Sequence, residues 1–590
     1  MLSLLQRLKQ RKIIRWVVAY AATAWVSLEF FDLIAEQFFW PVWVRQSATI
    51  ILLFGLFITI VLAWYHGEQG RQKIGVVELI LLVVLLSLGG QSVWLLRDNS
   101  LNIEPGANKV SATFRAEPLP QNSVAVLPCL NLGGDENKAH FADGLAAELI
   151  TRLSAVSGLR IPSHTSSFSF KGKNATIEEI AKVLKVRHVL ECDVSGDDSR
   201  LRASARLIDS QTGYTLWSQS YDNTNAQLFD VQQDVAEAVV ETLQIKLGLR
   251  EQQLVRRRWT ESTEAYDEFL RGIKFQLIAP TKENIIKMRQ HFERAIELDP
   301  DFGRGYARLA VTWVFLGNYQ LAPASEAYAE VERLAQKAIE LDGELYEAYW
   351  ALGWADLAGK YAWQAAENNF RKTIELAPGE WAGYHSLGYV LGVLGQIDEG
   401  LEAARIAIEL DPLAFSPRHG LEILLTRQRN YAAAIPVYEE QAEIHGSNLQ
   451  IQSAIAWLLA KAGKETEAQV QLADVEAQSP SKPLVQLIMA LAYAALGERD
   501  MALAIVERWE PRAQSTSEYN IAGVLAKIYA ELENADRAMY WLTRSRQEHS
   551  MWMLCLDGEA FDYLRADPRF VALIRELNLP EEVYLSAPHQ

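Results

Sequence analysis

The residues of this 590-residue chain that could take part in catalysis lie between about 122 and 250. They are His140, Asp143, Glu148, His164, Asp193, Asp197 and Asp198. The chain contains no G-x-S-x-G, H-E-x-x-H or C-x-x-C motif, and its Gly133-Gly134-Asp135 loop lacks the P-loop pattern that holds phosphates. Asp143 is instead expected to meet free N–H groups at a helix start. We therefore expect no catalytic, cofactor-binding or metal-binding residues and no enzyme activity.

Three cysteines, Cys129, Cys192 and Cys555, are too few for a disulfide scaffold or a four-cysteine zinc site. Cys129 and Cys192 both fall in expected strands. They pair if the strands are adjacent and lie outside the cytoplasm. Two buried thiols are the favoured alternative.

Residues that could bind a partner lie further along the chain, in a repeated segment. The phrases are AIELDP (295–300), AIELDG (338–343), TIELAP (373–378) and AIELDP (407–412), continued by QAEIHG (441–446) and VEAQSP (475–480). Their starts lie 43, 35, 34, 34 and 34 residues apart. A period of about 34 residues is the tetratricopeptide (TPR) signature of paired helices. The first step is longer, which indicates an insertion near 318–325.

The spacing of the repeat predicts which side chains face its concave surface, where such solenoids bind partners. In the clearest unit, 381–412, these are His385 and Tyr389. Corresponding positions in later units are His419 and Trp457. We predict these four residues as partner contacts, with a merely solvated groove as the alternative. The final segment, 561–579, is expected to cap the stack.

The segment that precedes the repeats alternates strand and helix patterns. We expect strands at 123–129, 159–161, 187–194, 200–208 and 214–221, with helices at 141–156, 177–184 and 228–247. The stretches SVAVLP (123–128), HFADGLAAELITRLS (140–154) and LRASARLIDSQTGYTLWSQSYD (201–222) resemble the TolB N-terminal/FlgO-like domain. The resemblance covers about 122–247. Cys129 stands where that family usually has Phe.

The resemblance implies an architecture found in CadC-like regulators and cyclase-associated proteins: a membrane anchor, this periplasmic domain and C-terminal TPR repeats. Too few residues precede the first apolar run for a cyclase or winged-helix domain, so those activities are not carried over.

The first 97 residues differ from the rest in charge and hydropathy. They hold nine Lys and Arg against five Asp and Glu, whereas the whole chain has a net charge of −17 and a mean hydropathy of −0.04. Apolar runs predict three transmembrane helices at about 16–36, 47–65 and 76–96. The first run has the shortest uncharged stretch, so an interfacial helix is its alternative. Basic residues before the first run and between the second and third place the N-terminus in the cytoplasm and residues after about 97 in the periplasm.

The expected fold class is thus a multidomain membrane protein with three N-terminal transmembrane helices, a small α/β domain and an all-α TPR solenoid. The expected boundaries are an anchor at 1–97, a linker at 98–121, an α/β domain at 122–250, a solenoid of about eight repeats at 260–560, and a cap and tail at 561–590.

These features predict a bacterial inner-membrane, multi-pass protein that scaffolds protein partners through its TPR groove without catalysis. The alternative is a transmembrane signalling protein that couples a periplasmic signal to a cytoplasmic cyclase, kinase or transcription partner. The lipid bilayer is a further expected partner. The net acidic charge favours a basic protein partner and argues against nucleic acid. Oligomeric state is left open.

Overall fold

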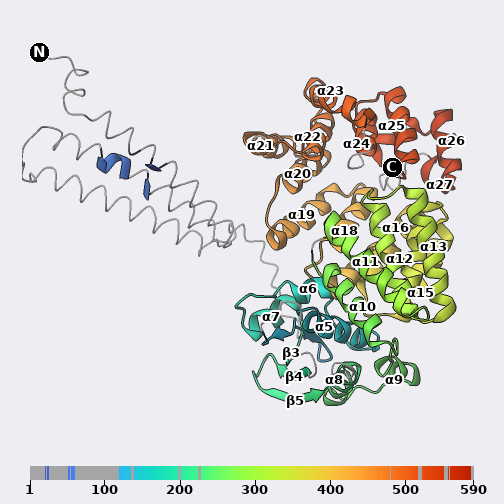
Figure 1. Cartoon of the computed structure of the whole chain (residues 1–590). Coiled ribbons are helices and arrows are strands. Elements are labelled where there is room, and N and C mark those ends of the chain that lie inside the picture. The colour runs from blue at the N-terminus through green and yellow to red at the C-terminus, as the bar shows by residue number, and fades with distance from the viewer. Residues whose placement is uncertain are drawn as a thin grey trace, which may run out of the picture. The chain divides into compact units, whose positions relative to one another are not determined.

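The computed structural model describes residues 119–586, with gaps at 134–138, 197–200, 224–227, 279, 479, 516–520, 550–555 and 557. It also describes residues 20, 23–24, 51–52 and 55–59. The chain divides into two compact units, Met1–Glu117 and Pro118–Gln590. The helices and strands described below all belong to the second unit (Figure 1).

The membrane part of the expected fold class is corrected by the structure. In the part of the chain that the structure describes, no helix combines the length and the apolar character needed to cross a bilayer. The three predicted transmembrane helices, the bilayer as a partner and the multi-pass inner-membrane location are therefore not supported. Most of the predicted spans, at 16–36, 47–65 and 76–96, lie outside the described residues, as does most of the predicted linker.

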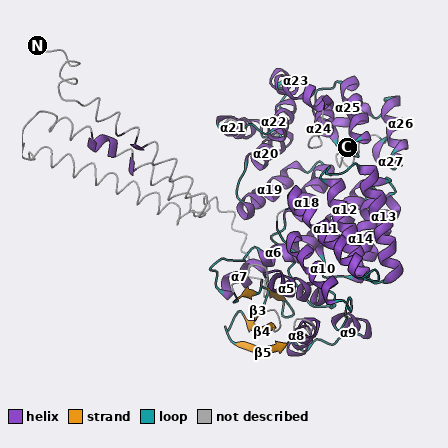
Figure 2. Cartoon of the chain, in the orientation of Figure 1, coloured by secondary structure: helices purple, strands orange, loops and turns teal. Residues whose placement is uncertain are grey.

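The α/β domain is a mixed sheet covered by helices (Figure 2). Its strands are β1 (Val124–Val126), β2 (Leu130–Asn131), β3 (His188–Gly196), β4 (Leu201–Asp209) and β5 (Thr215–Asn223). The order is β1-β3-β4-β5, and β2 also pairs with β3. β1 and β2 run parallel to β3, whereas β3, β4 and β5 are antiparallel neighbours.

The helices of this domain are α5 (Ala139–Ser154), α6 (His164–Phe168), α7 (Ile177–Leu184), α8 (Leu228–Thr242) and α9 (Leu249–Val255). α7 begins at a capping box in which Thr176 and Glu179 each accept a backbone N–H of the other. The expected strand at 159–161 is reduced to one bridge between Ser123 and Arg160. The hydrophobic faces of α5 and α8 contribute Leu145, Leu149, Val235 and Val239 to the main core.

The solenoid consists of antiparallel helix pairs. The first helices of the pairs are α10 (Thr263–Gln276), α12 (Gly303–Asn318), α14 (Tyr346–Trp354, extended by the π-helical turn η3, Ala355–Gly359), α16 (Trp381–Val393), α18 (Phe415–Arg427), α20 (Leu449–Lys461), α22 (Pro483–Ala495) and α24 (Ile521–Glu531). The second helices are α11 (Lys282–Leu298), α13 (Ala324–Leu341), α15 (Trp363–Leu376), α17 (Ile397–Leu410), α19 (Tyr431–His445), α21 (Glu465–Ala477), α23 (Arg499–Ser515) and α25 (Ala535–Gln547). The predicted TPR-like all-helical solenoid is confirmed.

The repeat phrases mark the ends of second helices. α11, α13, α15 and α17 end at Leu298, Leu341, Leu376 and Leu410, each inside its phrase. The longer first step is taken up by the 319–323 connection and by α13, which has 18 residues against 14 in α15.

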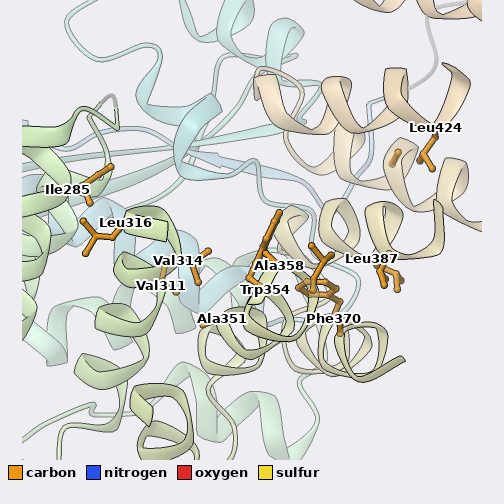
Figure 3. Close-up of a cluster of buried hydrophobic side chains, with 14 of the residues drawn as sticks. Ile285, Val311, Val314, Leu316, Ala351, Trp354, Ala358, Phe370, Leu387 and Leu424 are labelled. Carbon is orange, nitrogen blue, oxygen red and sulfur yellow. The ribbon is translucent and has the colours of Figure 1, made fainter. Parts of the chain in front are cut away.

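Small residues allow the helices of a pair to approach closely. A Cβ at Gly353 on α14 would lie 2.4 Å from Phe370 on α15, which is less than van der Waals contact. Phe370 is fully buried beside Trp354 in the cluster of apolar side chains shown in Figure 3. The core thus runs continuously along the solenoid.

After α25, the chain forms the turn η6 (Glu559–Leu564) and helices α26 (Pro568–Glu576) and α27 (Glu581–Tyr584). We refer to residues 558–586 as the C-terminal cap.

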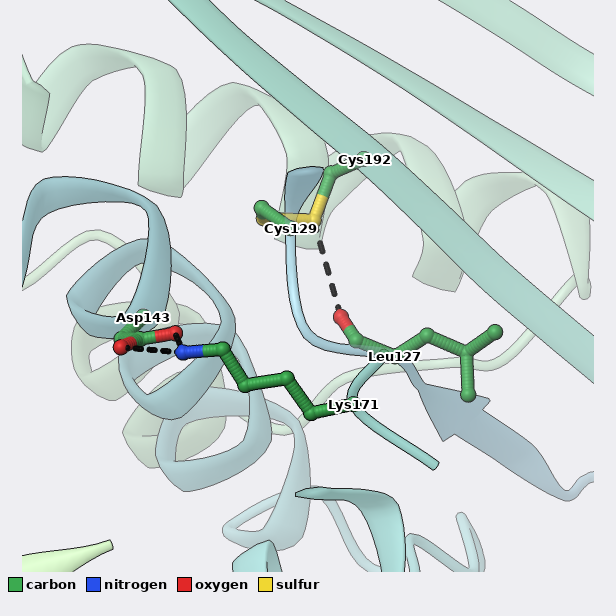
Figure 4. The surroundings of a disulfide bond; sticks show 5 residues. All are labelled: Leu127, Cys129, Asp143, Lys171 and Cys192. Carbon is green, nitrogen blue, oxygen red and sulfur yellow. Dashed lines mark hydrogen bonds and ion pairs between the residues drawn. A yellow bond between two sulfur atoms is a disulfide. The ribbon is translucent and has the colours of Figure 1, made fainter. Parts of the chain in front are cut away.

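The disulfide left open by the sequence forms between Cys129 and Cys192, which brings the segment after β1 onto β3 (Figure 4). Two buried thiols were the favoured alternative, so the pairing is a correction. The reason is register: β2 pairs Leu130 with Asp193, which places the preceding Cys129 beside Cys192.

Candidate partner-binding surface

Aromatic side chains of the first helices α12, α14 and α16 touch one another along the solenoid, and two further aromatic side chains lie on the next first helix, α18. We call this set the aromatic row: Phe315 from α12 and Tyr319 directly after it, Trp350 and Trp354 from α14, His385 and Tyr389 from α16, and Phe415 and His419 from α18. Ring-centroid distances between neighbours are 6.4 Å for Phe315–Trp350, 6.4 Å for Trp354–Tyr389 and 4.7 Å for His385–Tyr389. These lie within the range of favourable aromatic contacts.

The row arises from the repeat length. Phe315 and Trp350 are 35 residues apart, and so are Trp354 and Tyr389. A spacing close to the repeat period places each side chain at the same position of successive first helices. The Trp350 indole N–H also donates to Ser386 Oγ at 3.0 Å, which ties α14 to α16.

The row is partly exposed. Tyr319 is 52% exposed and Phe415 43% exposed, and the His419 side chain is 41% exposed. Two other members of the row, Trp354 and His385, are buried. Exposed aromatic groups on a rigid support are the side chains that contribute most to protein interfaces.

The structure brings three of the four predicted contact residues together. The His385 and Tyr389 rings meet in a T-shaped arrangement, and His385 also lies against Gly420, the neighbour of His419 on α18. Burial, aided by the charge of His419, lowers the pKa of His385 to about 3, so His385 is neutral at physiological pH. His419 Nδ1 lies 3.0 Å from Glu422 Oε2.

Trp457 lies elsewhere, outside the aromatic row. It is buried on α20, where it meets the edge of Tyr431, and Lys527 Nζ sits 4.0 Å from its ring centroid. The sequence did not identify Tyr319, Trp350 or Phe415. The 35-residue spacing of aromatic residues was the signal that could have found them.

The catalytic candidates of the α/β domain form structural contacts. His140 Nε2 lies 2.7 Å from Asp267 on α10, and His164 Nε2 lies 3.1 Å from the Ala147 carbonyl. Asp143 lies within α5 rather than at its start and accepts from Lys171 Nζ at 2.7 Å (Figure 4). Asp193 pairs in the sheet, and Asp197 and Asp198 lie outside the described residues. Across the described residues, no group of His, Cys, Asp or Glu could hold a metal ion.

Glu148, the remaining candidate, belongs to a buried ion network that joins the two domains. Arg304 on α12 donates to Glu148 on α5 at 2.5 Å and to Glu347 on α14 at 3.1 Å, and Arg308 also contacts Glu347 at 3.1 Å. Burial lowers the pKa of Arg304, but the attraction of Glu148 and Glu347 outweighs it and raises the pKa overall.

The α/β domain binds along the edge of the solenoid where second helices end. Ser163 and Ser166 donate to Asp411 after α17, Thr260 donates to Asp299 after α11, and Arg257 pairs with Asp342 at 2.7 Å. The Gly379 N–H donates to the Ser154 carbonyl at 3.2 Å, and a Cβ at Gly379 would lie 2.6 Å from that oxygen. The aspartates of the ELDP-type phrases therefore serve as docking points. We call this contact the domain seam.

The C-terminal cap binds along the other edge, where first helices end. Trp363 Nε1 donates to the Leu577 carbonyl at 2.8 Å, Arg429 pairs with Asp562 at 2.7 Å, and Lys461 pairs with Glu559 at 2.9 Å. The cap therefore joins helix pairs that are distant from one another in the stack.

Taken together, the fold defines a class of protein: a small α/β domain joined to a TPR-like helical solenoid. No family model matches the sequence. A curated relative, "Putative adenylate cyclase 3" of Rhizobium meliloti (strain 1021), is 34% identical over 246 residues. The match covers 41% of this chain and 42% of the relative, so the chain spans about two fifths of the length of the curated relative that it matches.

Solved structures with a similar arrangement include two TPR proteins. A thermophilic TPR protein of Thermus thermophilus has a TM-score of 0.28 and 17% identity, covering 33% of this chain and 98% of its own. A tetratricopeptide repeat protein of Parabacteroides merdae has a TM-score of 0.32 and 13% identity, covering 42% of this chain and 93% of its own.

Proposed function

We propose that this protein is a non-catalytic scaffold that binds a segment of a partner protein across the aromatic row. The observation that carries the proposal is the contact of aromatic side chains from α12 through α14 to α16, together with the exposure of Tyr319, Phe415 and His419. The docked α/β domain and cap stiffen the supporting helices, so little ordering of the row is required when a segment binds.

The chemistry of the row defines the kind of segment. Aromatic faces bind apolar side chains and, through their quadrupoles, cationic ones. The chain carries a net charge of −17, which attracts a basic segment at low salt. An extended peptide with alternating apolar and basic residues is therefore the proposed occupant.

A peptide-display selection against the full chain tests this proposal. Selected peptides are expected to bind at least about tenfold more weakly to a Tyr319→Ala/Phe415→Ala double variant, because truncation of an aromatic interface contact typically costs about 1 kcal/mol or more. The matched control is Tyr540→Ala on α25, which is similarly exposed at 47% but lies outside the row. Equal affinity for wild type, the double variant and the control would exclude the row as the binding surface.

A second candidate function is regulation of a nucleotide cyclase or another signalling enzyme by this scaffold. The match to a relative named as a cyclase favours it. The assay adds the purified full chain to an adenylate cyclase domain and measures cyclic AMP production from ATP. A changed rate that is lost in the Tyr319→Ala/Phe415→Ala variant would support regulation through the row. Cyclic AMP production by the chain alone would overturn the non-catalytic assignment.

A further inference from the structure

A small cavity lies inside the domain seam, where α5, α12 and α14 meet. Its volume is about 30 Å³. Its lining includes Arg152, Trp259, Arg304, Tyr346, Glu347 and Glu380. A cavity of this size holds one or two waters, or one ion of similar size.

The polar atoms around the cavity that lack partners are hydrogen-bond donors. Arg152 is 2% exposed and donates Nη1 to the Val255 carbonyl at 2.7 Å, while its Nε and Nη2 have no acceptor among the described residues. The same holds for Arg304 Nη2 and Trp259 Nε1. Arg304 lies over the Trp259 ring with its guanidinium carbon 4.5 Å from the centroid. Buried donors without acceptors are costly, so the cavity favours an occupant that accepts hydrogen bonds.

The charges within this described cluster favour a negative occupant. The guanidinium groups are those of Arg152, Arg304 and Arg308, whereas the carboxylates that interact with them are those of Glu148 and Glu347. Glu344 also lines the cavity, but it pairs with two other arginines, Arg250 and Arg257. Burial lowers the pKa of Arg152, which reflects the incomplete compensation of its charge.

Glu380 lines the cavity and could supply the missing negative charge. Burial raises its pKa to about 7, so a large fraction of Glu380 is protonated at neutral pH. The titratable and charged groups that face Glu380 come from three directions: Arg308 on α12, Tyr346 and Glu347 on α14, and Asp411 after α17.

We propose that the seam cavity is a binding site for one small monovalent anion, the size of chloride or of a carboxylate group, and that Glu380 takes up a proton when the anion binds. The unpartnered donors of Arg152, Arg304 and Trp259 hold the anion. Because the anion and the ionised Glu380 carboxylate balance the same positive charge, they exclude each other. The anion thereby tightens the contact between the α/β domain and the solenoid.

The test measures thermal unfolding of the full chain in a gluconate buffer, with chloride or formate added at constant ionic strength. Gluconate is too large for the cavity. Both small anions are expected to raise the unfolding midpoint of the wild type. Above about pH 7 the apparent affinity should fall by up to about tenfold per pH unit, because each anion bound requires one proton at Glu380. A response to formate but not chloride would identify a carboxylate group as the occupant, and the reverse would identify a halide.

Two variants test whether the stabilisation by small anions comes from binding in the seam cavity. Arg152→Met is expected to abolish the anion response, whereas Glu380→Gln is expected to keep it and remove its pH dependence. The matched control, Arg371→Met, removes an exposed guanidinium on α15 and should respond as the wild type does. Crystals of the wild type soaked in bromide provide a direct readout even if Arg152→Met does not fold. An anomalous peak beside Arg152 and Arg304 is expected. Ordered water alone at that position, or an equal response in all variants, would overturn the proposal.

Discussion

The buried carboxyl group of Asp411 makes the stability of the domain seam depend on pH, and an Asp411→Asn substitution tests this. Asp411 is fully buried and accepts from Ser163 and Ser166 of the α/β domain. Burial raises its pKa from 3.8 to about 6, against the opposing effect of these hydrogen bonds. The folded state therefore binds the proton more tightly than the unfolded state does.

The direction and the size of the change in stability with pH follow from the linkage between proton binding and folding. Because the folded pKa is raised, this stabilisation is fully present below about pH 3.8 and is lost as the pH rises through about 6. A shift of about two units corresponds to about 3 kcal/mol in total, a little under half of which falls between about pH 5 and pH 7.5. Asn does not titrate, so the variant should gain about 1.4 kcal/mol relative to the wild type over that interval.

The assay is urea unfolding followed by circular dichroism, with both proteins measured at both pH values. The quantity of interest is the change with pH in the difference between variant and wild type, which cancels the direct cost of the substitution. Asp536→Asn, at an exposed position of α25, controls for the generic effect of the replacement. A difference that stays constant with pH, or one that moves in favour of the wild type at higher pH, would refute the reasoning.

Three further outcomes are expected. Arg304→Met removes the cation that pairs with both Glu148 and Glu347, of which Glu347 keeps Arg308, and should cost about 3–5 kcal/mol of unfolding free energy, measured by urea titration. Gly353→Ala places a Cβ against Phe370 and should cost about 1–3 kcal/mol, whereas Gly343→Ala, with open space around its Cβ, should cost much less in the same titration. Reduction of the disulfide, which closes a span of 63 residues, should lower the free energy of unfolding by about 2–4 kcal/mol, and an unchanged urea midpoint would contradict this.

The repeated helices could be predicted from the sequence because their packing is local. Each helix contacts its neighbours in the chain, so a 34-residue period carries both the boundaries and the pairing. The repeat period also placed His385 and Tyr389 on one helix. Helix α7 could be predicted for a similar reason, because its capping box is a local pattern in the sequence. The strands of the antiparallel part of the sheet were predicted from their local residue patterns, close to the bounds that β3, β4 and β5 have in the structure.

The domain seam could not be predicted because its contacts join distant parts of the chain. Arg304 and Glu148 are 156 residues apart, and Ser163 and Asp411 are 248 apart. No periodic pattern relates such pairs. The ELDP-type phrases indicated only the repeat period, whereas Asp411 in one of them is a hydrogen-bond acceptor for another domain. The membrane spans were predicted from apolar runs, from the placement of charges and from the membrane anchor that the family resemblance implies, whereas the described residues contain no helix long and apolar enough to cross a bilayer.

The way the C-terminal cap spans the solenoid has a mechanical consequence. An open solenoid behaves as a spring, because each pair touches only the next and small rotations add up along the stack. Here Lys461 of α20 and Trp363 of α15 are both attached to the cap, so the intervening helix pairs are clamped between fixed points. To extend or twist the helix pairs between α15 and α20, contacts with the cap must first be broken. The part of the aromatic row on α16 and α18 therefore lies on helix pairs that the cap holds at both ends, so contacts far from the row limit how its helices can move.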